Sequence, residues 1–377
     1  MYRTKSVVAM LLVVCATSIQ AQETHIVDLA GTGDFVSIHD AVDAASAGDT
    51  IRVQPDQYAF TANLGPVSID KKLVIIGSGY MPVEEGGTEL IDIPGTGFFD
   101  ITGSGDGTVI KGFRIQGATD FLDTDAGASG ITIENNLFIG GTSIIAFAGS
   151  QDTVRSNIFV GTGTLTVFTS GASTQITNNI FSQSTLGFSA HYLLSISSSS
   201  GAVIAYNNFM NNAGTSGYTI RINTGAPEIY SNGFANHRGP SGNLSNAGTG
   251  FYTNNGFYGT SETQPFGLNT VLEDPSFTSF DPDNEVLDLE AIDDFEFDLT
   301  LAEGSEWINA GRTGTPYLDT DGSRSDIGIY AGPNPFDDGR GAPTVPVVIQ
   351  FQVNPTTVSP SGTITITATG RIGSGSN

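Results

Sequence analysis

The chain has 377 residues, of which only 14% are charged, and acidic residues outnumber basic ones strongly enough to give a net charge of −25. A single cysteine excludes a disulfide scaffold, and the shortage of cations argues against a nucleic-acid partner, because phosphate contacts need a basic face. The 48 glycines disfavour a typical helical enzyme, whereas 23 phenylalanines and 11 tyrosines supply enough apolar surface for a large core.

Residues 1–21 have the pattern of a secretory signal peptide. Arg3 and Lys5 precede an apolar run over residues 7–14 that is too short to span a bilayer. Cleavage after Ala21 or Ser18 would release the exported chain, and lipidation of Cys15 is the alternative form of processing. No later stretch is apolar enough to cross a membrane, so we expect a secreted or cell-surface protein without a membrane span.

Residues 22–60 are expected to form an N-terminal cap and a first coil. Phe35, Ile38, Val42 and Ala45 recur at helical spacing, which predicts a short amphipathic helix. Residues 48–55 follow as a strand that ends at a turn. A helix at this place would cover the open end of a solenoid, which otherwise exposes strand edges and core.

A repeat organises residues 61–260. Six short β-type segments each carry an Asn two positions before a Phe, and successive copies lie 21 to 28 residues apart. This period fits one coil of a right-handed parallel β-helix with three short strands, whereas the Leu ladder of leucine-rich repeats is missing. We expect the Asn at a tight bend in left-handed conformation with its amide bonded to the next coil, and the Phe in a stack along the core. The Phe residues are Phe138, Phe159, Phe181, Phe209, Phe234 and Phe257.

Several segments resemble known β-helix proteins. Residues 31–35 (Gly-Thr-Gly-Asp-Phe), 48–51 (Gly-Asp-Thr-Ile) and 55–58 (Pro-Asp-Gln-Tyr) resemble the opening of pectate-lyase-like and pectinesterase-like proteins, over roughly residues 26–260. The resemblance implies an all-β fold, a single-stranded right-handed parallel β-helix (pectin-lyase-like solenoid) with an N-terminal capping helix. It implies no single activity, because the superfamily includes lyases, hydrolases, esterases and adhesins. Residues 297–330 resemble the closing segment of bacterial surface β-helix proteins, which implies a surface location.

Candidate site residues come from the few charged and aromatic side chains of the central coils. Arg221 alternates with two isoleucines that point inward, so it points outward from a strand, where it could contact a uronate carboxylate. His237 and Arg238 lie in a turn and could assist catalysis there. The alternative for all of these side chains is an ordinary surface or packing role. The expected substrate-binding residues are His191, Tyr192 and Arg155.

Two acidic loops are candidate calcium sites. One carries three carboxylates within residues 120–125, and the other places carboxylates at its first, third and eighth positions around Gly322. Oxygens at alternate positions of a tight loop can converge on Ca²⁺, the only cofactor that the sequence suggests. The alternatives are a solvated turn for the first loop and an ion pair with Arg324 for the second. The candidate ligands are Asp120, Asp123, Asp125, Asp319, Asp321 and Asp326.

Residues 261–340 are expected to form an acidic end of the β-helix. Between positions 262 and 338, 19 acidic and two basic residues give a net charge of −17, which repels acidic polysaccharides unless divalent ions bridge them. Leu137, Ile158 and Ile180 each precede a core Phe and therefore point outward as an apolar stripe. Such a stripe needs cover, which predicts that the acidic segment or the tail packs on it.

Residues 341–377 form a short β tail in this prediction, with strands over 345–353 and 362–368. A tail of this length cannot bury a core of its own, so it docks on the solenoid or begins an immunoglobulin-like module.

The leading functional prediction is a secreted or cell-surface β-helix protein that contacts extracellular polysaccharide. The enzyme alternative is a polysaccharide lyase or glycoside hydrolase acting on the solenoid face around Arg221. The remaining alternative is a non-catalytic adhesin or envelope structural protein.

Overall fold

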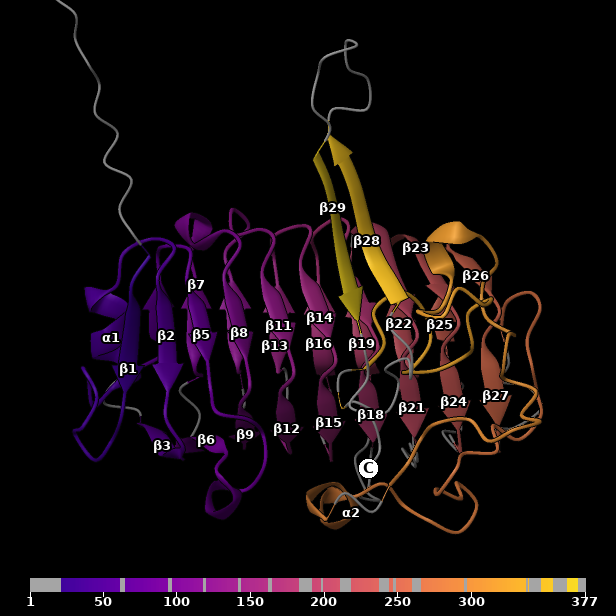
Figure 1. Ribbon diagram of the computed structural model, residues 1–377, viewed down its shortest axis with the longest axis horizontal. Coiled ribbons are helices and arrows are strands. Elements are labelled where there is room, and N and C mark those ends of the chain that lie inside the picture. Colours follow the sequence, from indigo (N-terminus) through magenta and orange to yellow (C-terminus); the bar gives the residue numbers. More distant parts are fainter. Residues whose placement is uncertain are drawn as a thin grey trace, which may run out of the picture.

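Three parallel sheets wind around one core to form a right-handed parallel β-helix, which confirms the predicted all-β fold (Figure 1). In each complete coil the chain adds one strand to each sheet, so neighbouring strands of a sheet belong to successive coils. The computed structural model describes residues 22–61, 65–93, 97–117, 120–141, 144–161, 165–182, 192–197, 199–210, 218–236, 244–246, 249–259, 266–294, 297–336, 338, 347–354 and 365–371.

The sheets are named A, B and C in the order in which a coil enters them. Sheet A consists of β1 (Thr24–Val27), β2 (Thr50–Val53), β5 (Val74–Ile76), β8 (Val109–Lys111), β11 (Thr132–Glu134), β14 (Thr153–Arg155), β17 (Gln175–Thr177), β20 (Ser199–Ala205), β23 (Gly225–Tyr230) and β26 (Phe251–Thr253). Sheet B consists of β3 (Asp56–Thr61), β6 (Thr88–Ile93), β9 (Arg114–Gln116), β12 (Leu137–Ile139), β15 (Ile158–Val160), β18 (Ile180–Ser182), β21 (Asn208–Met210), β24 (Gly233–Ala235) and β27 (Gly256–Tyr258). Sheet C consists of β4 (Val67–Ile69), β7 (Phe99–Ile101), β10 (Leu122–Thr124), β13 (Ile145–Phe147), β16 (Leu165–Thr169), β19 (Tyr192–Ile196), β22 (Ile220–Ile222) and β25 (Leu244–Asn246).

The predicted capping helix is confirmed as α1 (Ile38–Ala44), at the N-terminal end of the solenoid (Figure 1). Ser37 caps it, because its side-chain oxygen accepts a hydrogen bond from the backbone N–H of Asp40 at 3.2 Å. Ile38 and Val42 are buried against the first coils, as the helical spacing predicted. The helix therefore closes the core at this end.

A ladder of buried asparagine amides forms the tight bend between sheets A and B. The Nδ2 of Asn157 donates to the Oδ1 of Asn179 in the next coil at 3.1 Å, and its Oδ1 accepts from the Nδ2 of Asn136 in the preceding coil at 3.1 Å. The predicted amide contact between coils is confirmed. The ladder consists of Asn136, Asn157, Asn179, Asn207, Asn232 and Asn255.

The expected left-handed conformation falls on the residue before each ladder Asn, with φ between 53° and 59°. The reason lies in the hydrogen bonds of the bend: each amide turns inward to donate to the carbonyl two residues earlier, as Asn157 does to Arg155 at 3.0 Å. The chain reversal that permits this contact is made one residue earlier. The left-handed residues are Asn135, Ser156, Asn178, Tyr206, Ser231 and Asn254.

The predicted phenylalanine stack is confirmed. Neighbouring rings from Phe138 to Phe257 have centroids 4.7–5.0 Å apart and planes within 3–11° of parallel. All six rings are at most 1% exposed. The stack fills sheet B's side of the core and aligns successive coils in register.

The predicted cover of the apolar stripe is also confirmed, and the acidic C-terminal segment supplies it. Leu137, Ile158 and Ile180 are at most 1% exposed and pack in one cluster with apolar residues between positions 277 and 336. Figure 1 shows this segment in orange, running along the row of β18, β21, β24 and β27 and carrying α2 (Leu289–Asp293). Beside the stripe, the Arg114 guanidinium binds both carboxylate oxygens of Asp293, at 2.6 and 3.0 Å.

The remaining described elements are short. They are the 3-10 helices η1 (Val83–Glu85), η2 (Gly103–Gly105) and η3 (Thr315–Tyr317), and the antiparallel tail strands β28 (Val347–Asn354) and β29 (Thr365–Arg371). The tail strands pair with each other in a sheet of their own, so the two predicted strands are confirmed. None of the described helices has the length and apolar character that a membrane span needs.

One buried carboxyl makes stability depend on pH. Asp152 is fully buried; its Oδ1 accepts from the backbone N–H of Ile131 at 2.9 Å, whereas its Oδ2 has no partner among the described residues. Burial raises the pKa of Asp152 to about 7. Between an ordinary carboxyl pKa of about 4 and this value, the unfolded chain loses the proton that the folded chain keeps.

We therefore expect Asp152 to contribute a fall in the free energy of unfolding on the order of 3 kcal/mol as the pH rises from about 4 to about 7. Asp152→Asn removes this titration, so the variant should be more stable than the parent protein at pH 8 and similar to it at pH 4. Urea unfolding across this pH range measures the difference. Asp43→Asn, at an exposed position of α1, is the matched control and should leave the profile unchanged. Parallel profiles for the parent and Asp152→Asn would contradict the expectation.

Candidate functional site

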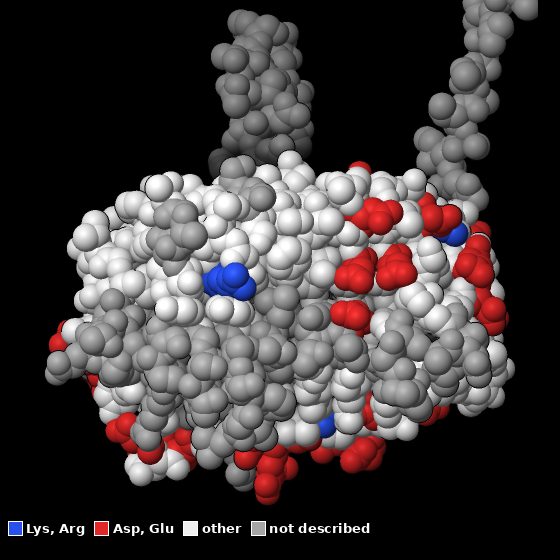
Figure 2. All heavy atoms as spheres, turned by 180° about the vertical axis from the view of Figure 1, so that it is seen from behind, with Lys and Arg blue, Asp and Glu red and all other residues white. Residues whose placement is uncertain are grey.

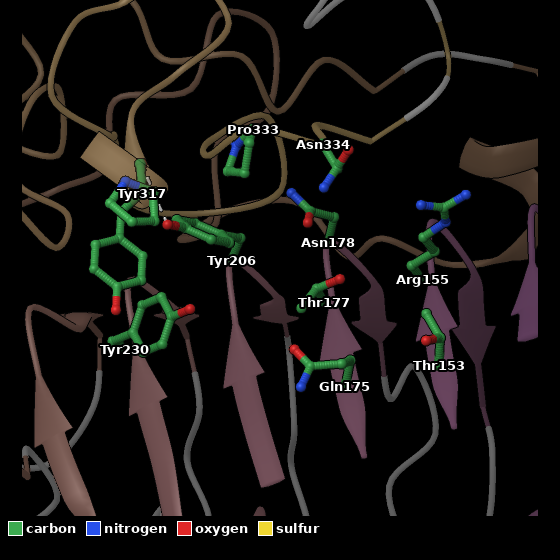
Figure 3. A pocket seen from close by; sticks show the side chains of 11 residues that line it. Thr153, Arg155, Gln175, Thr177, Asn178, Tyr206, Tyr230, Tyr317, Pro333 and Asn334 are labelled. Atoms are coloured by element: carbon green, nitrogen blue, oxygen red, sulfur yellow. Dashed lines mark hydrogen bonds between the residues drawn. The ribbon is translucent and has the colours of Figure 1, made fainter. Parts of the chain in front are cut away.

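A hollow with a volume of about 270 Å³ lies between the outer face of sheet A and the C-terminal segment (Figure 3). Its floor comes from four consecutive coils, and its roof from two turns of the C-terminal segment. We call it the tyrosine pocket. The lining residues are Thr153, Arg155, Gln175, Thr177, Asn178, Tyr206, Tyr230, Pro316, Tyr317, Pro333 and Asn334.

The period-2 alternation of the strands exposes the polar floor of the pocket. Val154 and Ile176 point into the core. Their neighbours in the strand therefore point outward. Thr153 pairs with Gln175 across neighbouring strands, and Arg155 pairs with Thr177. Two adjacent coils therefore present a hydroxyl, an amide, a guanidinium and a second hydroxyl side by side.

Three tyrosines form one wall of the pocket. Tyr206 and Tyr230 meet edge to face with ring centroids 5.5 Å apart, and Tyr230 and Tyr317 do so at 5.4 Å. The Tyr206 hydroxyl donates to the carbonyl oxygen of Tyr317 at 3.4 Å. Burial raises the pKa of Tyr230 to about 12 and also raises that of Tyr206, so both hydroxyls stay protonated at neutral pH.

Arg312 supports this wall from the side away from the floor residues. Its guanidinium lies 4.6 Å from the ring centroid of Tyr230 and 4.3 Å from that of Tyr317. It also forms an ion pair with Glu228 on β23. The roof is held by Asn178, whose Nδ2 donates to the carbonyl oxygens of Ile329 and Ala331 at 2.8 and 2.9 Å. The wall and roof are thus fixed by contacts between the solenoid and the C-terminal segment.

Arg155, one of the predicted substrate-binding residues, lies on the opposite side of the pocket from Tyr317 (Figure 3). Its Nη2 is 2.6 Å from the Oε2 of Glu134, and the Nζ of Lys111 is 3.1 Å from the Oε1 of the same carboxylate. Burial opposes the ionisation of Glu134, but these two cations hold its pKa below the ordinary value. Glu134 thus stays charged and fixes the position of Arg155.

Arg221 and Tyr192 lie together on sheet C. Arg221 points outward from β22, as predicted, and its guanidinium is 4.8 Å from the centre of the Tyr192 ring. His191, His237 and Arg238 lie outside the described residues. Arg155 is on sheet A, so among the described residues of the predicted set it lies apart from Arg221 and Tyr192.

A second hollow, of about 330 Å³, lies on sheet C near the N-terminal end of the solenoid. Asp123 pairs with Asp100 across β10 and β7, and both line the hollow together with Asp125. Burial, with the nearby charges of Asp123 and Asp125, raises the pKa of Asp100. Figure 2 shows acidic side chains gathered toward the N-terminal end of the face that is turned away in Figure 1. Asp120 precedes β10 and is not among the residues that line this hollow.

In the second predicted calcium loop, protein donors hold the carboxylates. Asp319 accepts from the backbone N–H groups of Asp326 and Gly332, and Asp321 accepts from that of Ser323. Asp326 accepts from the N–H of Asn309 at 2.6 Å.

Arg324 does not pair with these acids, because its guanidinium donates to the carbonyl oxygens of Gly311 and Ala310 instead. In the part of the chain that the structure describes, no three His, Cys, Asp or Glu residues come together as a metal site, so calcium finds no support there.

The fold defines this chain as a right-handed parallel β-helix protein. A family model described as "Periplasmic copper-binding protein (NosD)" matches residues 98–263, which is less than half of the chain. No curated protein matches.

Solved structures similar to this chain include three that act on or bind carbohydrate according to their descriptions. Pectate lyase Pel9A has 16% identity and a TM-score of 0.46, over 82% of this chain and 96% of its own. A pectin methylesterase from carrot has 11% identity and a TM-score of 0.41, over 66% of this chain and 88% of its own. The catalytic domain of a GH87 alpha-1,3-glucanase in complex with tetrasaccharides has 11% identity and a TM-score of 0.30, over 60% of this chain and 64% of its own.

The described residues do not fit the copper in the family description. Copper in proteins is bound by imidazole, thiolate and thioether groups. His25 is hydrogen-bonded to Asp49 at 3.1 Å, and His39 to the carbonyl oxygen of Gly65 at 3.1 Å, so the two described histidines have separate protein partners. Met210 is buried in the cluster under the C-terminal segment.

Most residues of the tyrosine pocket carry no signal in the sequence, but one of them does. The residue before the ladder Asn is Asn or Ser in the other repeats, and Tyr206 is the exception. A large aromatic ring at a bend that usually holds a small polar residue marks the coil on which the pocket is built.

Proposed function

We propose that this chain is an exported β-helix protein that binds polysaccharide, and that the tyrosine pocket is its binding site. The pocket is the observation that carries the proposal. Sugar rings present apolar C–H faces and a rim of hydroxyls, so aromatic rings beside hydroxyl and amide side chains match both features. Tyr206, Tyr230 and Tyr317 supply the rings, while Thr153 and Gln175 supply hydrogen-bonding groups.

The composition of the pocket favours binding over cleavage. Hydrolysis of a glycosidic bond ordinarily needs a pair of carboxyl groups, and other acid–base chemistry most often uses histidine. Neither an Asp, a Glu nor a His is among the residues that line the pocket. Export is supported by the signal-like sequence of residues 1–21 and by the periplasmic description of the matching family.

Tyr317→Ala is expected to weaken glycan binding by about tenfold or more, because it removes one ring of the wall and about 1.4 kcal/mol or more of binding free energy. Affinity electrophoresis and calorimetry against dextran, galactomannan, mixed-linkage β-glucan, polygalacturonate and alginate measure the effect. Tyr258→Ala is the matched control, since Tyr258 lies on sheet B and does not line the pocket. Equal losses in the two variants, or no binding by the parent protein, would rule out the proposed site.

The second candidate function is cleavage of an acidic polysaccharide on sheet C. It is favoured by the outward Arg221 guanidinium above Tyr192, a cation positioned for a uronate carboxylate. Incubation of the protein with polygalacturonate and alginate, with and without Ca²⁺, tests it through new reducing ends and unsaturated-uronate absorbance. Cleavage that disappears in Arg221→Ala would replace the binding proposal with an enzymatic one.

A further inference from the structure

We infer that the tyrosine pocket holds the end of an uncharged glycan chain, one or two sugar units deep, rather than an internal segment. This inference rests on the proposed function and names the ligand class of the same site. It follows from three features of the pocket: one closed side, a small volume and a lining whose one charged side chain is ion-paired.

The closed side is the tyrosine wall. Arg312 stacks on Tyr230 and Tyr317 behind the wall, at 4.6 and 4.3 Å, and also lies 5.3 Å from the Phe251 ring. Its ion pair with Glu228 attaches this layer to the solenoid. A glycan that runs along the sheet toward higher residue numbers would therefore meet packed side chains at the wall.

The opposite side of the pocket is open. Arg155 stands there with 42% of its side chain exposed. Beyond it, Thr132 continues the polar row of Thr153 and Gln175 onto the preceding strand, β11. A glycan chain can thus leave the pocket over β11, along the axis of the solenoid.

The dimensions fit a chain end. The pocket covers four strands, whose three spacings of about 4.8 Å give a length of about 14 Å, and Tyr206 and Tyr230 occupy the part over β20 and β23. The volume of about 270 Å³ lies just below the range of about 300–1,000 Å³ that is typical of sites for drug-sized ligands. The polar floor that remains lies on β14 and β17, and because a 1,4-linked sugar unit advances a glycan by about one strand spacing, one or two rings occupy it.

The charge distribution selects an uncharged sugar. Arg155 is the one ionised side chain among the lining residues, and its guanidinium is ion-paired with Glu134, a carboxylate that it shares with Lys111. An anionic glycan would also have to approach a chain whose net charge is −25. The hydroxyls of an uncharged sugar can form hydrogen bonds with Thr153, Thr177 and Gln175 and need no opposite charge in the pocket.

Counting chain ends tests the inference. Dextran, galactomannan and mixed-linkage β-glucan are each shortened about tenfold by partial hydrolysis, and the amount of protein bound per milligram of immobilised glycan is measured before and after. Recognition of ends predicts a rise of about tenfold for the glycan that binds. A capacity that does not change would mean recognition of internal segments, and binding of polygalacturonate or alginate alone would mean a charged ligand; either result overturns the inference.

Variants keep this outcome separate from failure of the proposed function. Gln175→Ala removes a floor amide whose described hydrogen bond is long, 3.5 Å to the carbonyl oxygen of Ser173, so folding should be preserved. One outcome contradicts only the recognition of ends. Gln175→Ala and Tyr317→Ala both lose binding, so the pocket remains the binding site, but the amount of parent protein bound per milligram of glycan does not change when the glycan is shortened. No binding of any glycan by the parent protein overturns both proposals.

Discussion

Asn179→Ala is expected to lower the free energy of unfolding by about 4 kcal/mol, because one buried side chain serves three coils. Its Oδ1 accepts from the backbone N–H and the Nδ2 of Asn157, at 3.0 and 3.1 Å. Its Nδ2 donates to the carbonyl oxygens of Val154 and Thr177 and to the Oδ1 of Asn207. Truncation removes the Oδ1 acceptor of the buried Asn157 backbone N–H and one further hydrogen bond from each of the other groups, and a buried polar group left unpaired costs about 1–3 kcal/mol.

Guanidinium chloride unfolding, followed by far-UV circular dichroism, measures this loss. Asn223→Ala is the matched control: its Nδ2 donates to the Ser197 Oγ at 2.7 Å in a half-buried position, where water can replace the missing amide. We expect the control to lose less than about 1 kcal/mol. If the two variants were destabilised equally, the ladder would have no special part in holding the coils together.

The interior of the solenoid was predictable because it repeats. Each coil from Phe138 to Phe257 buries a ring at the position of Phe159 and bonds an amide at the position of Asn157, so the same residue types recur at similar spacing. The apolar stripe was predictable for a related reason, since outward Leu137 and Ile158 need cover. The left-handed residue was misplaced by one position, because several polar residue types occupy it and leave no single-letter signal.

The tyrosine pocket was not predictable in the same way. Tyr206 and Tyr317 are 111 positions apart, and their contact depends on where a non-repeating segment crosses the solenoid. Repeat spacing aligns residues of one coil with those of the next, but it carries no information about this crossing. The second predicted calcium loop finds no support for a different reason: the spacing of Asp319 and Asp321 fits a cation, yet both carboxyl groups accept hydrogen bonds from backbone N–H groups.

Trp307→Ala is expected to cost about 4 kcal/mol of stability and also to abolish glycan binding. Trp307 is fully buried, and its Nε1 donates to the carbonyl oxygen of Glu273 at 3.0 Å. Its ring lies directly against Gly233 and Gly256, where an added Cβ would come within 2.4 and 2.6 Å of the indole. These glycines continue the outward row of the apolar stripe, so the indole fills the space that larger side chains occupy in earlier coils.

Removing the indole would leave a cavity between the solenoid and the segment that carries Tyr317 and the pocket roof. We therefore expect Trp307→Ala to lose the binding that Tyr317→Ala weakens, while the far-UV spectrum of the solenoid is retained. Trp307→Phe should recover part of both properties, because a ring still fills most of the space. Thermal unfolding and calorimetry with the glycan that binds the parent protein measure the two effects together. A destabilised Trp307→Ala variant with undiminished affinity would separate the binding site from the C-terminal segment and would place it on the solenoid alone.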